Sequence, residues 1–286
     1  MFSRLIGGSK MVLGLHRPRR SLKIWPDDIF LVSFPKSGNT WTRFLIANLV
    51  YPEKAVGFKN IHLLVPDPYG TTKRDLDRMA RPRIIKSHEC FEPRYPKVMY
   101  IVRDPRDVVI SQYHYHRKCN KIEDGYPMEK FVDRFIAGDT CPHGSWGENV
   151  GTWLTARHND PRFLLLRYED MVADTHREMA RVATFVGINA DAERIAKAVD
   201  RSSADRMRQL EKAQADDCGL TKETRKDLSF VRAAKSGSWQ KDLPEHLVGK
   251  IEDAWPRIMT FLGYKLATRD EAGQAAEFSS LVSSGA

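Results

Sequence analysis

Residues 29–50 constrain the fold of this 286-residue chain more strongly than any other stretch. Residues 29–34 are an apolar run of strand length, and from Thr40 onward apolar residues recur at the three- and four-residue spacing of a helix. Between the two elements, Pro35 ends the strand and Gly38 permits a tight turn. Residue types that cap a helix N-terminus lie beside this glycine: Ser37, Asn39 and Thr40. The stretch therefore predicts a strand, a turn and a helix.

The predicted turn has the composition of an anion-binding loop. Its five residues are Lys36, Ser37, Gly38, Asn39 and Thr40. Backbone N–H groups at a helix start, the positive end of the helix dipole and a lysine together favour a phosphate or sulfate group. In the common nucleotide-binding loop, G-x-x-x-x-G-K-[ST], the lysine follows the second glycine. Here Lys36 precedes Gly38, so the sequence predicts a phosphate-binding loop of a different kind.

The remaining chain predicts an α/β fold with a P-loop-like nucleotide-binding core. Further apolar runs of strand length occupy residues 83–88, 97–102 and 162–167. Helical patterns follow or separate them, chiefly at residues 168–186, 190–210 with a break at 201–203, and 244–262. Strands that alternate with helices favour a central parallel sheet with helices on both sides. Asp104 is expected to cap a helix that begins at Pro105.

Composition and chain ends add broader expectations. The chain has 46 basic and 37 acidic residues, a formal charge of +9, which suits an anionic ligand, a nucleic acid, an acidic membrane surface or simply a solvated surface. We find no internal repeat or mid-chain linker, so we expect one domain at residues 25–266, after a basic arm at 1–24 and before a disordered tail at 267–286. The arm is compatible with peripheral contact to an anionic membrane. No apolar run approaches the roughly 18 residues of a membrane span.

The cysteines are widely spaced and include no C-x-x-C pair, so neither a disulfide framework nor a zinc site is expected. This usage fits a reducing compartment, and we expect a cytoplasmic protein. His114, His116 and Cys119 do not suggest a metal site either, because neighbours two apart on a helix point away from each other.

Polar residues at the expected strand ends are candidates for chemistry. Ligands of open parallel sheets bind beyond the carboxyl ends of the strands. Lys86 and His88 lie at the end of the second predicted strand, and Arg103 follows the third. The irregular stretch at residues 51–82 is the candidate location of an acceptor pocket. A histidine with an ordinary pKa near 6.5 can accept a proton close to neutrality, although a structural role for His88 is equally open.

Several of these segments together resemble the sulfotransferases that use 3′-phosphoadenosine 5′-phosphosulfate (PAPS). The order P-K-S-G-N-T-W at residues 35–41 resembles the family's phosphosulfate loop, and residues 101–111 resemble its second signature. Residues 232–239 resemble the late R-K-G-x-x-G-x-W motif. The resemblance spans residues 25–264 and implies transfer of a sulfonate group from PAPS, with adenosine 3′,5′-bisphosphate (PAP) as the product and no metal ion.

The resemblance also assigns roles to individual residues. It implies His88 as the base, with Lys36 and Lys86 stabilising the leaving group. The implied nucleotide-binding residues are Lys36, Ser37, Gly38, Asn39, Thr40, Trp41, Arg103, Ser111, Tyr168, Ser202, Ser203 and Arg232. The chain departs from the family's pattern at four positions. Ala233 and Ala234 stand at the Lys and Gly positions of the late motif, and Ala204 stands where the adenosine-contacting segment often has phenylalanine. Asn149 stands where many small-molecule members have a histidine near the acceptor, which leaves the acceptor class open.

Two other functions stay open from the residues alone. One is a phosphotransferase that uses ATP and Mg²⁺, in which Asp104 would bind the metal. The other is a non-catalytic binder of nucleic acid or of another anion. For the sulfotransferase we expect a hydroxyl or amine acceptor on a small molecule, a glycolipid or a carbohydrate, and no nucleic acid partner. The sequence does not determine the oligomeric state.

Overall fold

A computed structural model describes residues 17–214, 222–231 and 235–268. Its centre is a four-stranded sheet with the order β2-β1-β3-β4. The strands are β1 (Ile29–Ser33), β2 (Ile84–Ser87), β3 (Lys97–Val102) and β4 (Phe163–Arg167). All three pairings are parallel, which confirms the predicted parallel sheet. Parallel pairing brings the carboxyl ends of all four strands to one edge of the sheet.

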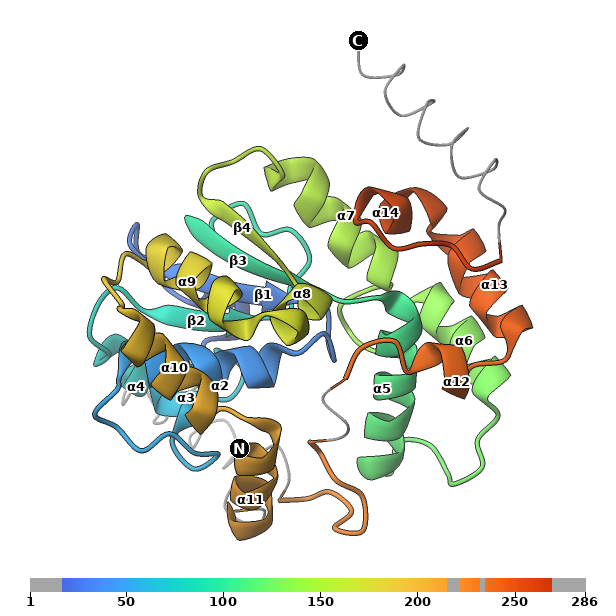
Figure 1. Ribbon diagram of the computed structural model, residues 1–286, viewed down its shortest axis with the longest axis horizontal. Helices are drawn as coiled ribbons and strands as arrows, with labels where there is room; N and C mark the ends of the chain where they lie inside the picture. Colours follow the sequence, from blue (N-terminus) through green and yellow to red (C-terminus); the bar gives the residue numbers. More distant parts are fainter. Residues whose placement is uncertain (1–16, 215–221, 232–234, 269–286) are drawn as a thin grey trace, which may run out of the picture.

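Helices cover both faces of the sheet (Figure 1). One face packs against α2 (Asn39–Val50), α9 (Thr175–Val186) and α10 (Ala192–Arg201). The opposite face packs in a second apolar cluster with residues of five other helices: α5 (Pro105–Lys118), α6 (Met128–Ala137), α7 (Trp146–Arg157), α13 (Glu245–Ala254) and α14 (Pro256–Phe261). Side chains alternate between faces along a strand. Leu31 of β1 therefore packs on the face covered by α2, α9 and α10, whereas Phe30 and Val32 pack on the opposite face.

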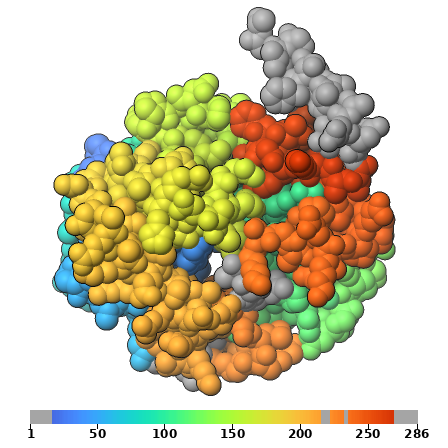
Figure 2. Space-filling model, viewed as in Figure 1, coloured from blue at the N-terminus to red at the C-terminus, as the bar shows by residue number. Residues whose placement is uncertain are grey.

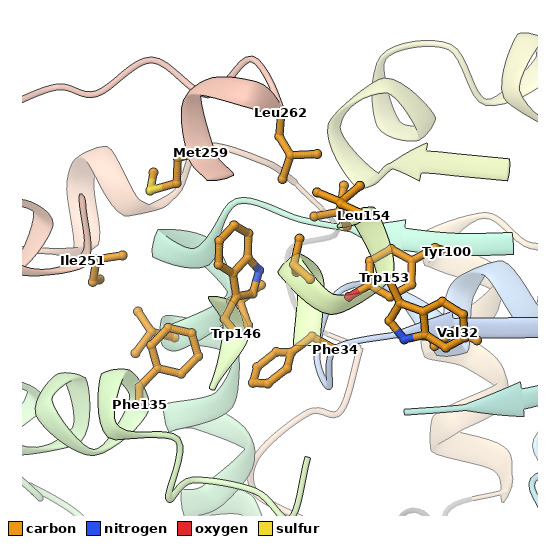
Figure 3. Packing of buried hydrophobic residues seen from close by; sticks show 14 of the residues in the cluster. Val32, Phe34, Tyr100, Phe135, Trp146, Trp153, Leu154, Ile251, Met259 and Leu262 are labelled. Atoms are coloured by element: carbon orange, nitrogen blue, oxygen red, sulfur yellow. The ribbon is translucent and has the colours of Figure 1, made fainter. Parts of the chain in front are cut away.

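Two tryptophans of α7 fix that helix against the sheet. Trp146 and Trp153 are fully buried. Trp146 lies close to Phe135 of α6, and Trp153 lies beside Tyr100 of β3 (Figure 3). Fully burying large aromatic side chains contributes roughly 2–3 kcal/mol each, so α7 and the connection that precedes it are held firmly.

The two helix starts that frame the site differ in their caps. Asp104 caps α5 as predicted: its carboxylate accepts a hydrogen bond from the Arg106 backbone N–H, and Pro105 is the first helical residue. At α2 the prediction of a side-chain cap is wrong. The capping position is Gly38, with φ of +100°, and no side chain caps the helix. The reason is that Asn39 turns its amide back to the Leu31 carbonyl and the Ser33 hydroxyl.

Other expected helices are shorter than predicted. The helix expected at 168–186 is divided into α8 (Tyr168–Ala173) and α9, because the Asp174 side chain caps a new start. The helix expected at 244–262 is divided at Pro256, which cannot continue an α-helix. The predicted break at 201–203 separates α10 from α11 (Ala204–Gln214). Short elements complete the described chain: η1 (Arg19–Ser21), α3 (Ile61–Leu64), α4 (Lys73–Asp77) and α12 (Trp239–Asp242).

No helix within the described residues has the length and apolarity needed to cross a membrane. The predicted basic arm and tail fall largely on residues 1–16 and 269–286, which lie outside the described part of the chain.

Candidate active site

The site lies at the sheet edge where β1 and β2 end. The register pairs Val32 with Ser87, so Ser33 and His88 follow side by side. His88 Nδ1 lies 2.7 Å from the Ser33 carbonyl oxygen. Because a carbonyl oxygen only accepts hydrogen bonds, this contact requires the proton on Nδ1. The lone pair of His88 is then on Nε2, the nitrogen that can accept a proton.

The backbone of His88 is held from a second side. Asn149 of α7 donates its side-chain amide to the His88 carbonyl oxygen at 3.1 Å, and the Tyr100 hydroxyl donates to the Asn149 oxygen at 2.8 Å. Asn149 and Tyr100 are fully buried. The imidazole is therefore positioned by three neighbouring elements, β1, β3 and α7.

The surroundings of His88 keep it neutral. Burial, followed by the positive charge of Lys86, lowers the pKa of His88 well below its usual value. The Lys86 ammonium in turn lies 2.5 Å from an oxygen of Asp67. Burial also lowers the pKa of Lys86 itself, although Asp67 acts in the opposite direction. A neutral imidazole with a free Nε2 is what proton acceptance requires.

The phosphate-binding loop has the backbone geometry of an anion site. Lys36 and Gly38 both have positive φ, of 72° and 100°. A Cβ atom at Gly38 would lie 2.5 Å from a ring carbon of Tyr168, so the loop and this ring are in close contact. The Ser37 hydroxyl is buried and has no hydrogen-bond partner among the described residues. Buried polar groups usually have a partner, so this hydroxyl fits a ligand oxygen.

One face of α5 lines the space next to the loop. Asp107, Ser111 and Tyr115 are spaced by four residues and therefore share a helix face. At one end of this row, Asp107 accepts hydrogen bonds from the backbone of Gly237 and Trp239. At the other end, the Lys36 ammonium lies 4.4 Å from the ring centre of Tyr115. Ser111, half-buried, lies between them.

Arg103 connects the loop to the other predicted residues. Its guanidinium donates to the Lys36 carbonyl at 3.5 Å and to the Lys235 carbonyl at 3.0 Å, and it lies 4.3 Å from the ring centre of Tyr168. Arg103 Nε is buried without a partner among the described residues. A cationic group with a spare donor is well suited to a phosphate.

Trp41 forms the aromatic part of the site. Its ring meets Tyr168 edge-on with centroids 5.8 Å apart, and its indole N–H donates to the Ser202 carbonyl at 3.0 Å. Ser202 is fully buried, and its hydroxyl accepts a hydrogen bond from Asn48. Ser202 thus holds Trp41 in place, and the half-buried Ser203 follows it. The structure therefore brings Lys36 and Trp41 of one segment together with Arg103 and Tyr168 of two others.

The molecular surface is hollowed between the yellow segments and the orange segments, with blue atoms of the N-terminal part of the domain visible inside (Figure 2).

Arg232, Ala233 and Ala234 lie outside the described residues, so the structure does not place them. A cavity of about 570 Å³ is lined in part by the segment at 236–240. Its wall carries both carboxylates, of Asp104, Asp107 and Glu169, and cations, of Arg106 and Lys265.

Sequence reasoning did not find several residues of the site. Phe230 lies 4.5 Å from the Lys36 ammonium, measured to the ring centre, and Asp67 pairs with Lys86. His143 places its ring centre 5.7 Å from that of His88. Asp67 is in the irregular stretch predicted as the acceptor side, but nothing in its local pattern indicates a pairing 19 residues away. Within the described residues, no three His, Cys, Asp or Glu side chains cluster as metal ligands.

Comparisons with known proteins agree with this geometry. The sulfotransferase domain family matches residues 26–263. Sulfotransferase 1A1 from Bos taurus is 28% identical over 239 residues, covering 78% of this chain and 80% of the bovine protein. Cytosolic sulfotransferase 12 from Arabidopsis thaliana is 28% identical over 247 residues, covering 79% and 75%. The crystal structure of mouse sulfotransferase SULT7A1 complexed with PAP has a TM-score of 0.66 and 25% identity, covering 84% of this chain and 87% of that one.

Proposed function

Because this chain belongs to the family of PAPS-dependent sulfotransferases, we propose that it moves the sulfonate group of PAPS to a hydroxyl or amine of its acceptor, with His88 as the base. The observation that carries this proposal is the position of His88. Its imidazole is bonded to Ser33 at the end of β1, the strand that leads directly into the phosphate-binding loop. A single strand end therefore positions both the base and the donor site.

His88 accepts the proton of the acceptor hydroxyl through Nε2. A neutral hydroxyl is a weak nucleophile, so removal of its proton during attack on sulfur raises the rate, typically by a factor on the order of 10²–10⁴. The Ser33 carbonyl holds the Nδ1 proton and stabilises the imidazolium that forms. The acceptor oxygen gains the bond to sulfur, and the bond from sulfur to the phosphate oxygen of the donor breaks.

Lys36 and Lys86 stabilise the negative charge that develops on the leaving phosphate oxygen. Both ammonium groups are on the segments that flank Ser33 and His88, and Lys86 is mostly shielded from solvent. Charge interactions in such a site are stronger than in water. Lys36 would turn from the rings of Tyr115 and Phe230 toward the donor.

The chain's other predicted residues would bind the nucleotide. Arg103 and Ser111 suit the 3′-phosphate, because Arg103 has a spare buried donor and Ser111 is on the adjoining helix face. The residues at 37–40 would hold the 5′-phosphosulfate, and Trp41 with Tyr168 would contact the adenosine, supported by Ser202 and Ser203. We assign Arg232 to the 3′-phosphate on the motif alone. The nucleotide itself supplies the transferable sulfonate.

The finer assignments are our proposals. We propose an acceptor among small molecules, glycolipids and carbohydrates, a cytoplasmic location, and a reaction that needs no metal. Arg103, whose guanidinium has a spare buried donor, favours a nucleotide with a 3′-phosphate over ATP. If so, PAP without metal should raise the thermal unfolding midpoint more than ATP with Mg²⁺, and the reverse order would favour a phosphotransferase.

Substitution of the base tests the main proposal. His88→Ala should lose sulfonate transfer from PAPS while the dissociation constant for PAP stays near that of the wild type, because His88 contacts the acceptor side. Products are scored by mass spectrometry across a panel of hydroxylated acceptors. His158→Ala, which removes a surface histidine packed on Phe261, is the matched control and should retain transfer. Wild-type turnover in His88→Ala would remove His88 from this role.

A further inference from the structure

A second imidazole lies beside His88. His143 is in the connection between α6 and α7, and its ring centre is 5.7 Å from that of His88, with the two planes at 55°. His143 Nδ1 is buried and has no hydrogen-bond partner among the residues that the structure describes. A buried polar atom without a partner costs stability unless a ligand or water binds it. This nitrogen is therefore a candidate contact for a bound molecule.

The connection that carries His143 is held in place. The His143 carbonyl lies 3.2 Å from the Cys90 sulfur, which can donate a hydrogen bond to it. Two residues later, Ser145 and Glu148 form a capping box at the start of α7. Because α7 is fixed by its buried tryptophans, the imidazole of His143 has a defined place next to His88.

Charged side chains of other segments act electrostatically on His143, and the ring of His88 lies beside it. These charges are those of Glu89, Lys86, Arg20 and Asp67. Burial lowers the pKa of His143, so at neutral pH its ring carries one N–H donor and one lone pair. A purely apolar acceptor would exclude water from these groups without replacing its hydrogen bonds, which is costly. The surroundings thus favour an acceptor that is polar close to its reacting hydroxyl.

We propose that His143 hydrogen-bonds a second polar group of the acceptor and thereby selects acceptors with adjacent hydroxyl or amino groups, as in catechols and sugars, over those with an isolated hydroxyl. The short separation of the two rings is the reason for adjacency: if one hydroxyl meets His88, a group that meets His143 must be attached nearby on the acceptor. This inference rests on the proposed function, because it assumes that the reacting hydroxyl lies at His88.

A matched pair of acceptors tests the inference. 4-Nitrocatechol and 4-nitrophenol differ by one adjacent hydroxyl, and kcat/KM for sulfonate transfer to each is compared in wild type, His143→Phe and His143→Gln. Pairing of a buried polar group is worth roughly 5- to 100-fold, so the wild type should prefer 4-nitrocatechol by about this factor. His143→Phe should bring the ratio near one, and His143→Gln, whose amide can still hydrogen-bond, should restore part of it.

A binding measurement separates this inference from the proposed function. Calorimetry of each compound with the enzyme–PAP complex should show the same preference, lost in His143→Phe, while the dissociation constant for PAP does not change. If His143→Phe and His143→Gln both transfer sulfonate with the wild-type preference for 4-nitrocatechol over 4-nitrophenol, the role of His143 is overturned and the proposed function stands. Preferential, His143-dependent binding of 4-nitrocatechol, with no transfer to it or to any acceptor of the panel, would overturn the proposed function and leave His143 as a residue that binds adjacent polar groups. Absence of binding by both compounds would overturn the selection for adjacent groups.

Discussion

Gly38→Ala should disrupt nucleotide binding for two separable reasons. The first is the backbone: with φ of +100°, any side chain at this position is strained, by about 1–3 kcal/mol. The second is contact, because the new Cβ would lie 2.5 Å and 2.8 Å from two ring carbons of Tyr168. The ring cannot move alone, since it packs against Arg103 and Trp41. The substitution therefore displaces three residues that we assign to the nucleotide.

The chain contains a matched control for the backbone effect. Gly187, which ends α9, has φ of +79°, and a Cβ there would meet nothing within 4 Å. Gly187→Ala should cost about 1 kcal/mol of stability, which lowers the melting temperature by roughly 2–4 °C, and should leave PAP affinity unchanged. Gly38→Ala should show a comparable or larger loss of stability together with at least a tenfold weaker PAP affinity, equivalent to about 1.4 kcal/mol or more.

Calorimetric titration with PAP, beside thermal unfolding of each variant, measures both effects. Wild-type PAP affinity in Gly38→Ala would refute the reasoning, because it would mean that the ring of Tyr168 can move without consequence for the nucleotide. Equal weakening of PAP binding in Gly187→Ala would also refute it, since the loss would then reflect general destabilisation.

Two further predictions concern pH and stability. Burial and the positive charge of Lys86 lower the pKa of His88, so kcat/KM should stay level through neutrality and fall only when the pH drops below 6.5, as the imidazole becomes protonated. A pH–rate profile in which kcat/KM falls with a midpoint at or above pH 6.5 would contradict this account. Arg83→Ala should destabilise the fold by about 3–5 kcal/mol in denaturant unfolding, because it leaves the fully buried carboxylate of Asp28 without its partner. Arg81→Ala, at the exposed pair with Asp27, should destabilise the fold far less than Arg83→Ala, and equal losses in the two variants would show that burial does not decide the difference.

Short-range patterns predicted the sheet well. The strand at Lys97–Val102 and the Asp104 cap were both predicted, because an apolar run and the sequence that follows it carry all the necessary information. The start of α2 was not predicted correctly, since the side chains expected to cap it include Asn39, which instead contacts β1. The division at Pro256 follows from a local rule, but the continuous apolar pattern on both sides of this proline concealed it.

The site was only partly predictable from the sequence. Residues within recognisable motifs, such as Lys36 and Arg103, were predicted because each motif is a short continuous stretch of sequence, although their contacts in the structure come from distant segments. Asp67 and His143 were missed, since their contacts join positions that are distant in the chain and lie in irregular segments. Such contacts depend on how helices pack on the sheet, and that packing leaves no local signature.

The double role of Ser33 has a consequence for how enzymes with this architecture can diverge. Its carbonyl fixes the imidazole of His88, and its hydroxyl accepts a hydrogen bond from Asn39 in the donor loop. The proposed base and the proposed donor loop thus share one anchor, and a shift of one should move the other with it. Within the described residues His143 makes no contact with the donor loop, so changes in acceptor choice are expected to accumulate around His143 while the chemistry is retained.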